Sequence, residues 1–237
     1  TRALAAEGAA VVVAGRTPGP LEAVAAEIRA AGGRAWAVPA EVTDPESVGS
    51  LGRAARQHLG HVQILVNNAG VAHSARLDEI TLDDWNRVLA VNATGTFLCT
   101  REFIASMIER RWGRVVNVAS TAGLAGGRYI AAYSAAKHAV VGFTRSVAAE
   151  VARTGVTCNA VCPAFVDSEL TRAAVERVVA RTGRAPHDAL AAVLASASQP
   201  RLIAPAEVAH AVLALCVRGS EETNGEAIVI DGRTASA

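Results

Sequence analysis

Three consecutive segments stand out near the middle of the chain: RVVNVA (114–119), AYSAAKHAVVGFTRSVAAEVAR (132–153) and VTCNAV (156–161). The two short segments are rich in valine, as strands buried on both faces of a parallel sheet are. The long segment contains no proline and has the length of a helix. A strand, a helix and a second strand in this order predict two parallel strands joined by a crossover helix.

The same alternation extends from this unit toward both ends of the chain. Further strands are predicted for the apolar runs at 10–14, 34–38, 64–66 and 227–230. Helices are predicted at 1–7, 20–31, 44–60, 81–111, 168–198 and 205–218. No linker-like stretch or internal repeat divides the sequence. It therefore predicts a single α/β domain over residues 1–237, built on a doubly wound, mostly parallel sheet.

The composition excludes several classes of protein. A net charge of +1 with interspersed signs gives no basic surface for nucleic acid or for an anionic membrane. No apolar run reaches the roughly 20 residues that a transmembrane helix needs. The four cysteines show neither CxxC nor cysteine–histidine spacing, so no metal site is predicted. Unpaired thiols and the lack of a signal sequence lead us to expect a cytoplasmic protein.

Polar residues follow three of the predicted strands at the point where each strand ends. Asn67-Asn68-Ala69-Gly70 follows the run at 64–66, Ser120 follows RVVNVA, and Pro163 comes shortly after VTCNAV. The carboxyl ends of parallel strands meet at one edge of a sheet, and ligands bind there in doubly wound folds. These residues therefore predict a binding site at that edge.

A tyrosine and a lysine share one face of the helix predicted at 132–153. Tyr133 and Lys137 are four residues apart, which is one helical turn. Lys137 is the single lysine among the 23 lysine and arginine residues, and Tyr133 is one of two tyrosines. Each residue alone has an ordinary structural explanation: a surface pair for Tyr133 and Lys137, a turn residue for Ser120, and a buried polar residue for Asn92.

Taken together, these motifs resemble the short-chain dehydrogenase/reductase family. The similarity lies in the order of Asn67-Asn68-Ala69-Gly70, Asn92, Ser120 and Tyr133-x-x-x-Lys137, and it extends over essentially the whole chain. It implies a Rossmann-like fold and an NAD(P)-dependent enzyme that interconverts a ketone and a secondary alcohol. The catalytic residues that it implies are Asn92, Ser120, Tyr133 and Lys137.

The chemistry of these residue types agrees with such roles. A tyrosine that transfers a proton near neutral pH must lower its pKa by about 3 units, or about 4 kcal/mol. A cation about 5 Å away supplies roughly 3 kcal/mol at an effective dielectric constant of about 20, so we expect Lys137 to lower the pKa of Tyr133. Ser120 would hydrogen-bond the substrate carbonyl oxygen. By resemblance, Asn92 would hold a water that links Lys137 to solvent, and Lys137 would also bind the cofactor ribose.

The family's glycine-rich loop, which binds the pyrophosphate of the cofactor, has no counterpart in this sequence. The segment at 1–7 is similar to the end of the helix that follows that loop. We therefore expect the fold to lack the family's first strand and glycine-rich loop, the chain to be truncated at its N-terminus, and cofactor binding to be weakened.

Arg16 favours a dinucleotide that carries a 2′-phosphate. Family members that prefer NAD usually have an acid at the end of the second strand, where this chain has Gly15 followed by Arg16. An arginine can pair with the 2′-phosphate, so NADP is predicted in preference to NAD, although a solvated arginine is the alternative. The other cofactor contacts that the resemblance implies are Glu41, Val42, Asn68, Ala69, Gly70, Tyr133, Lys137, Pro163, Val166 and Ser168.

Residues 168–203 are expected to form a lid over the substrate. Arginines recur in this segment, at Arg172, Arg177, Arg181 and Arg184. They form either a solvated helix face or a docking surface for a phosphopantetheine carrier or coenzyme A. The stretch at 199–208 resembles 3-oxoacyl-thioester reductases and 3-hydroxyacyl-CoA dehydrogenases.

The leading prediction for the reaction is NADPH-dependent reduction of a 3-oxoacyl thioester, carried by acyl carrier protein or coenzyme A, to the 3-hydroxyacyl form. The alternatives are a dehydrogenase of another alcohol (cyclic, steroid-like or sugar) and a non-catalytic truncated assembly subunit. The resemblance also implies a homotetramer, with the helices predicted at 81–111 and 132–153 packing across one interface.

Overall fold

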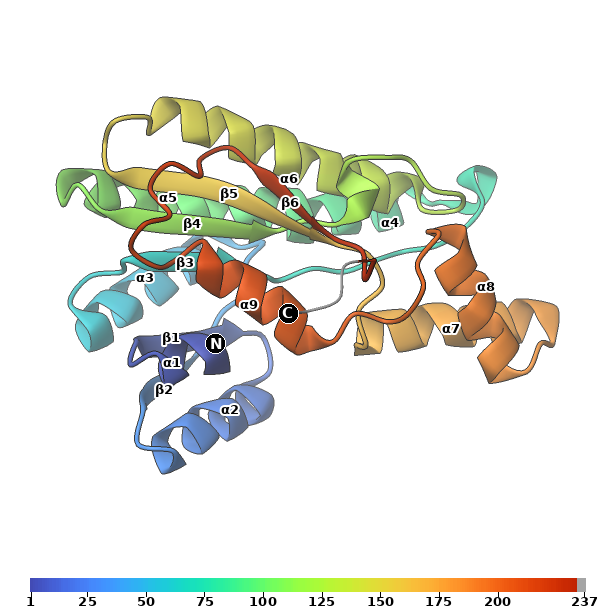
Figure 1. Cartoon of the computed structure of the whole chain (residues 1–237), viewed down its shortest axis with the longest axis horizontal. Helices are drawn as coiled ribbons and strands as arrows, with labels where there is room; N and C mark the ends of the chain where they lie inside the picture. Colours follow the sequence, from blue (N-terminus) through green and yellow to red (C-terminus); the bar gives the residue numbers. More distant parts are fainter. Residues whose placement is uncertain (234–237) are drawn as a thin grey trace.

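The computed structural model describes residues 1–233, which form parallel β-sheets covered by helices (Figure 1). All strand pairs are parallel, so the predicted parallel α/β architecture is confirmed. One sheet contains β1 (Ala10–Gly15) and β2 (Arg34–Pro39). The other contains, in spatial order, β3 (Ile64–Asn67), β4 (Gly113–Val118), β5 (Val156–Pro163) and β6 (Ala227–Ile230).

The two sheets are not hydrogen-bonded to each other in the described part of the chain. There, β1 pairs only with β2, and β3 pairs only with β4. The small sheet has its own core, in which Val11 and Ala35 pack against Ala25 and Ile28 of the helix that joins β1 to β2. Val12 of β1 and Val38 of β2 pack instead against the cluster that contains Val115 of β4, so the two sheets share part of the core although no hydrogen bond joins them.

Several of the helices begin where the sequence provides proline or a capping side chain. Asp44 accepts hydrogen bonds from the main-chain N–H groups of Glu46 and Ser47, and Pro45 occupies the first helical position. The helices of the described residues are α1 (Arg2–Ala6), α2 (Pro18–Ala30), α3 (Pro45–Leu59), α4 (Leu82–Leu89), α5 (Gly95–Glu109), α6 (Ala131–Glu150), α7 (Glu169–Thr182), α8 (Pro186–Ser196) and α9 (Pro205–Ala214).

The helix predicted at 81–111 is interrupted. A π-helical turn, η2 (Ala90–Thr94), separates α4 from α5, so the prediction of one regular helix is wrong. The helix predicted at 132–153 is α6, and the segment at 168–198 forms α7 and α8. These two helices are divided by Gly183, whose left-handed φ of 68° ends α7, and by Pro186, which begins α8.

The four-stranded sheet is buried on both faces. On one face, Val115 of β4 packs in a cluster with Phe103 and Met107 of α5. On the other face, the next residue, Val116, packs with Val212 and Leu215 at the end of α9. Every position of β5 is buried as well. Apolar packing on both faces explains why these strands are continuous apolar runs instead of alternating ones.

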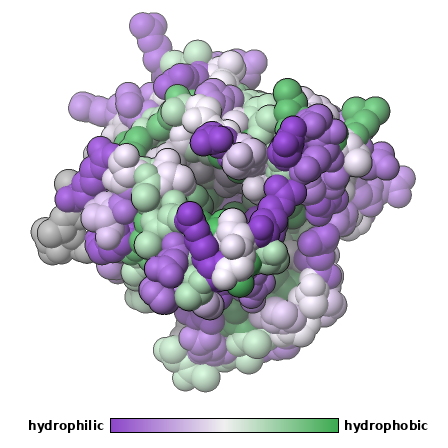
Figure 2. All heavy atoms as spheres, turned by 90° about the vertical axis from the view of Figure 1, so that its right-hand side faces the viewer, coloured by the Kyte–Doolittle hydropathy of each residue, from purple (hydrophilic) through white to green (hydrophobic). Residues whose placement is uncertain are grey.

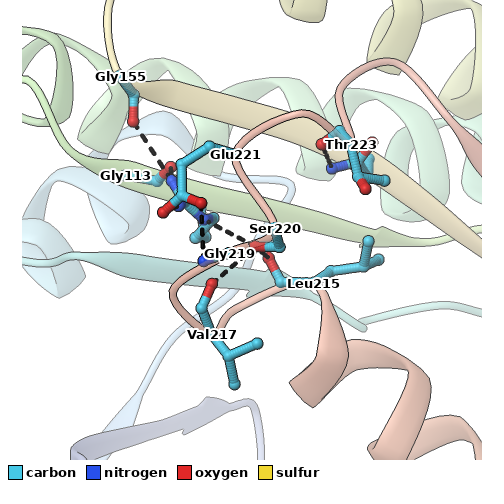
Figure 3. A network of polar contacts seen from close by, with 10 residues as sticks. Gly113, Gly155, Leu215, Val217, Gly219, Ser220, Glu221 and Thr223 are labelled. Atoms are coloured by element: carbon cyan, nitrogen blue, oxygen red, sulfur yellow. Dashed lines mark hydrogen bonds and ion pairs between the residues drawn. The ribbon is translucent and has the colours of Figure 1, made fainter.

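A buried arginine joins the amino end of this sheet to the loop before β6 (Figure 3). Arg114 is fully buried and donates hydrogen bonds to Glu221 at 2.9 Å and to Ser220 at 3.3 Å. It also donates to the carbonyl oxygens of Gly113 and Gly155. The guanidinium is thus paired and hydrogen-bonded, as a buried charge must be, and it lies at the end of the strands opposite their carboxyl edge.

Helices α7 and α8 pack against each other beyond the carboxyl end of β5 (Figure 1). Arg181 near the end of α7 forms an ion pair of 2.8 Å with Glu79 of the short helix η1 (Leu77–Glu79). This contact brings α7 next to the loop that follows β3. Within residues 1–233, no helix is long and apolar enough to span a membrane.

Candidate active site

Ser120 is held between the ends of β4 and β5. It follows β4 and caps the short helix η3 (Thr121–Gly123), because its Oγ accepts a hydrogen bond from the N–H of Ala122 at 3.1 Å. The same hydroxyl donates to the carbonyl oxygen of Pro163, the last residue of β5, at 3.3 Å. Both strand ends therefore fix the position of the serine.

Tyr133 and Lys137 lie on the first turns of α6. The side chain of Lys137 is buried and its Nζ donates a hydrogen bond of 2.8 Å to the carbonyl oxygen of Val118, the last residue of β4. The same Nζ lies 5.7 Å from the centre of the Tyr133 ring. Lys137 therefore lies beside both Tyr133 and the end of β4.

Asn92 presents an unpaired acceptor to this region. It lies in the π turn and is 1% exposed, and its Nδ2 donates to the carbonyl oxygens of Val71 and Val88, both at 2.8 Å. Its buried Oδ1 has no hydrogen-bond partner among the described residues. A Cβ atom placed on Gly70 would lie 2.9 Å from this Oδ1 and 3.6 Å from the Nζ of Lys137. The oxygen and the ammonium thus adjoin the same glycine.

The pKa values of the site differ from expectation in one respect. Burial raises the pKa of Tyr133 above its ordinary value, and a hydrogen bond with Ser120 only partly offsets that increase. Burial also lowers the pKa of Lys137 to about 8. The pKa of Tyr133 is therefore raised in the protein alone and not lowered as expected, because burial is the largest influence on it.

The predicted nucleotide-binding residues Arg16 and Glu41 lie together at the carboxyl ends of β1 and β2. They line an open hollow of about 330 Å³ with Pro39, Ala40 and Ser47. The Nε of Arg16 is 4.0 Å from the Oε2 of Glu41, and the arginine side chain is 69% exposed. Such a solvated pair contributes little to stability, so Arg16 is available to a ligand.

The other predicted cofactor residues follow the strand ends. Asn68, Ala69 and Gly70 form an exposed loop after β3, whereas Val42 packs with Val48 and Leu98 below the loop after β2.

Two more of these residues lie after β5. Val166 pairs with Ile203 in a short parallel bridge. The hydroxyl of Ser168 accepts from the N–H of Thr171 at 3.4 Å and so caps α7. The predicted contact of Ser168 with the cofactor would compete with this cap.

Sequence reasoning singled out Asn67 but did not find the network of side-chain hydrogen bonds that it forms below the site. The Nδ2 of Asn67 donates to Asn117 of β4 at 2.8 Å and to Thr100 of α5 at 3.0 Å. The Nδ2 of Asn117 donates in turn to Thr144 of α6 at 2.9 Å. The asparagine inside the apolar run RVVNVA was the available signal, because a buried polar residue needs a partner.

Comparison with known proteins identifies a matching family model and similar relatives. A family model described as short chain dehydrogenase matches residues 1–178. A D-beta-hydroxybutyrate dehydrogenase of Cupriavidus necator is 35% identical over 98% of this chain and 90% of its own length. A 3-oxoacyl-[acyl-carrier-protein] reductase of Synechocystis is 42% identical over 71% of this chain and 69% of its own length.

The fold is also similar to that of a solved structure. The crystal structure of a variant of actinorhodin polyketide ketoreductase with NADPH has a TM-score of 0.92 and 34% identity, and the match covers 98% of this chain and 89% of that one. The predicted N-terminal truncation finds no support in alignments that take in 98% of this chain. From the matching family model, the similar relatives and the site geometry, we conclude that the chain belongs to the short-chain dehydrogenase/reductase family and is an oxidoreductase.

Proposed function

We propose that the protein catalyses the NADPH-dependent reduction of a 3-oxoacyl thioester to a 3-hydroxyacyl thioester. The observation that carries the proposal is the placement of Ser120 and Tyr133 side by side, with the buried ammonium of Lys137 next to them. A hydrogen-bond donor, a protonated acid and a cation at one point are what the reduction of a carbonyl group requires.

Tyr133 acts as the general acid in this proposal. Its raised pKa keeps the hydroxyl protonated at neutral pH, so it can donate a proton to the substrate oxygen as negative charge develops there. The Ser120 hydroxyl donates a hydrogen bond to the same oxygen, in exchange for its bond to Pro163. The ammonium of Lys137 stabilises the tyrosinate that remains after proton transfer.

Asn92 and Lys137 return a proton to the tyrosine. The unpaired Oδ1 of Asn92 adjoins Gly70 on the side where the Lys137 ammonium lies. A water bound to that oxygen would accept a hydrogen bond from Lys137 and connect it with solvent. This arrangement gives the buried acceptor of Asn92 the partner that it needs.

The residues present fit a nicotinamide dinucleotide, which supplies the hydride when it is bound. The Nζ of Lys137 has a single acceptor among the described residues, which leaves one N–H group for the water at Asn92 and one for a ribose hydroxyl. The exposed loop Asn68–Gly70 adjoins this lysine, because a Cβ atom placed on Gly70 would lie 3.6 Å from its Nζ. Arg16 would pair with a 2′-phosphate, which favours NADPH over NADH.

A thioester substrate is supported by the relatives and by the surface around the site. The names of two relatives refer to a 3-oxoacyl carrier protein and to beta-hydroxybutyrate, and both compounds carry oxygen at carbon 3. The end of the molecule that carries α7 and α8 presents hydrophobic side chains among hydrophilic ones (Figure 2). Four exposed leucines lie on η1, the start of α4, the loop after η3 and α7: Leu77, Leu82, Leu124 and Leu170. An acyl chain uses such a surface better than a sugar does.

The arginines of the lid divide into two groups. Arg172 pairs with Asp167 and Arg181 pairs with Glu79, so both are already neutralised. Arg184 forms no ion pair with the described residues, and the buried Nε of Arg177 has no hydrogen-bond partner among them. Any docking of a phosphopantetheine carrier or coenzyme A would therefore rest on Arg177 and Arg184.

We also propose that copies of the chain assemble, as a homotetramer, through α5 and α6. Phe97 and Ile108 of α5 are 40% and 38% exposed, which is large for apolar side chains. The four cysteines are free and buried, in keeping with the proposed cytoplasmic location. Light scattering at several protein concentrations tests the assembly.

Turnover tests the proposed reaction directly. Purified protein is mixed with NADPH and acetoacetyl-CoA, and oxidation of NADPH is followed by absorbance, with a cyclic ketone and a keto sugar as parallel substrates. We expect the highest kcat/KM with the thioester. A clear preference for the cyclic ketone or the sugar would overturn the assignment of a thioester substrate. If the protein binds NADPH but turns over none of the ketones, the proposed reductase activity is overturned.

A further inference from the structure

A buried glutamine lies next to the loop that leaves the site. Gln199, between α8 and α9, is 5% exposed and carries no charge. Its Oε1 accepts a hydrogen bond of 2.8 Å from the main-chain N–H of Phe165, and its Nε2 donates one of 2.8 Å to the carbonyl oxygen of Phe165. One side-chain amide thus satisfies both main-chain polar groups of a single residue, as a neighbouring strand would.

These hydrogen bonds extend a short parallel pairing after the end of β5. The N–H of Ile203 donates to the carbonyl oxygen of Phe165 at 3.0 Å, and the N–H of Asp167 donates to that of Ile203 at 2.9 Å. The N–H of Phe165 has no acceptor other than Gln199 among the described residues. Gln199 therefore completes a pairing that the main chain alone leaves unfinished.

The segment that contains Gln199 is itself fixed. Arg201 donates two hydrogen bonds, of 2.7 and 2.8 Å, to the carboxylate of Glu207 on the first turn of α9. This pairing holds the pKa of Glu207 at about 2. The Nε2 of Gln199 also donates to the carbonyl oxygen of Arg201. Gln199 is thus held against a segment anchored on α9 and can fix the position of Phe165.

The residue that Gln199 holds is two positions away from the anchor of the candidate catalytic serine. The carbonyl oxygen of Pro163 accepts the hydrogen bond of Ser120, and the N–H of Ala164 donates to Ile230 of β6 at 2.9 Å. The three residues from Pro163 to Phe165 are therefore held by β6 on one side and by Gln199 on the other. A shift of Phe165 would move the carbonyl oxygen of Pro163, to which the Ser120 hydroxyl donates its hydrogen bond.

We propose that Gln199 is a positioning residue for the reduction: its amide fixes the main chain of Phe165 and, through Pro163, the hydroxyl of Ser120. This inference rests on the proposed reductase activity and not on the identity of the ketone. An apolar residue of similar size would leave the N–H of Phe165 unpaired. A glutamate would keep the acceptor but face the carbonyl oxygens of Phe165 and Arg201 with a second oxygen instead of a donor.

Two variants of Gln199 and one matched control test the proposal. Gln199→Leu removes all hydrogen bonds of the side chain, and Gln199→Glu keeps its size but removes its N–H groups. Asn224→Leu is the control, because the side-chain amide of Asn224 also makes two main-chain hydrogen bonds, which join the opposite end of β5 to α6. There it accepts from the N–H of Cys158 and donates to the carbonyl oxygen of Ala148, both at 2.9 Å.

Kinetics and hydrogen exchange are measured on all four proteins. For both Gln199 variants we expect kcat to fall about tenfold with less than a twofold change in the KM of the ketone. Amide exchange in the peptide that covers 164–168 should become at least tenfold faster. Asn224→Leu should lower the melting temperature by about as much as the Gln199 variants do. Its kcat and its amide exchange at 164–168 should stay within twofold of wild type.

The outcomes separate this proposal from the proposed function. Exchange needs no substrate, and kcat is measured with whichever ketone the wild-type protein reduces, so a wrong thioester assignment leaves the test intact. Unchanged amide exchange at 164–168 in Gln199→Leu would overturn the proposal that Gln199 fixes the main chain of Phe165. An equal loss of kcat in Asn224→Leu would show that both residues act only through stability, and would overturn the positioning role.

Discussion

The two central strands of the four-stranded sheet, β4 and β5, are more deeply buried than the strands of the two-stranded sheet, and the candidate functional residues beside them differ in the same way. Every residue of β5 and nearly every residue of β4 is buried. Most residues of β1 and β2 are half-buried or exposed. Lys137, which rests on the end of β4, is 4% exposed. Arg16, at the end of β1, has a side chain that is 69% exposed.

The difference corresponds to two kinds of electrostatic task. Proton transfer needs groups whose pKa values are set by the protein, and removal from water is what shifts them. Recognition of a phosphate needs a permanent charge that a ligand can reach, and an exposed arginine on a small sheet is sufficient. Substitutions in the four-stranded sheet should therefore have large effects on rate, and substitutions in the two-stranded sheet should have small effects on cofactor choice.

Removal of the Tyr133 hydroxyl should have the largest effect. Tyr133→Phe keeps the buried ring but deletes the proton donor, and general acid catalysis commonly contributes between about 10² and 10⁴ in rate. We expect kcat to fall about 10³-fold with little change in the affinity for NADPH. Ketone-dependent oxidation of NADPH measures the rate, and quenching of protein fluorescence measures the affinity.

The other tyrosine provides a matched control. Tyr129 lies in the loop before α6 and is 50% exposed, and Tyr129→Phe should leave kcat within about twofold. Retention of more than a tenth of the wild-type kcat in Tyr133→Phe would contradict the role of Tyr133 as the acid.

The burial of Lys137 should appear as a pH dependence of stability. Its pKa is about 8 in the folded protein and 10.5 when unperturbed, so between these values the unfolded chain binds more protons and stability rises with pH. From pH 7.5 to 9.5 this contribution amounts to about 2 kcal/mol. Lys137→Met should lose that rise, which urea unfolding of both proteins at the two pH values measures.

The comparison of the two proteins isolates the lysine, because the other titrating groups are shared. If the difference in unfolding free energy between wild type and Lys137→Met is the same at both pH values, the lysine is not desolvated to the extent that the structure shows.

Reversal of the charge at Arg16 should have the smallest effect. Arg16→Asp places a carboxylate where a 2′-phosphate would bind, and we expect the ratio of kcat/KM for NADPH to that for NADH to fall about tenfold, or about 1.4 kcal/mol. The maximal rate with saturating NADPH should stay close to that of wild type, because Arg16 lies outside the buried site.

Arg34→Asp is the control for this variant. Arg34 is exposed at the opposite end of the same small sheet. Its replacement by aspartate therefore changes the net charge by the same amount without changing the hollow at Arg16. An equal change in cofactor preference in both variants would assign the effect to net charge and would argue against a 2′-phosphate site.

Much of the fold could be predicted because its determinants are local. Valine-rich runs identified β4 and β5, and parallel strands bring Ser120 and Pro163 to one edge wherever the rest of the chain lies. Spacing alone put Tyr133 and Lys137 on one face of a helix. These predictions required no knowledge of distant contacts.

The remaining features depend on contacts between distant segments. The direction of the Tyr133 pKa shift follows from the burial of the whole site, which no local motif encodes. Gln199 and Phe165 are 34 positions apart, and an isolated glutamine before a proline gives no signal of its target. The π turn was missed because residues 81–111 carry the composition of one continuous helix.

The π turn also separates two effects of a change in chain length. A regular helix rotates by about 100° per residue, and the five residues of a π turn cover about the same rotation as four α-helical residues. Loss of one residue from Ala90–Thr94 would therefore leave a regular helix, with Phe103 and Met107 still facing β4. The turn itself would be rearranged, and Asn92 would lose its place beside Gly70. A single-codon deletion in this stretch should thus disturb the candidate site while it preserves the packing of α5, which makes the extra residue a feature of the site and not of the core.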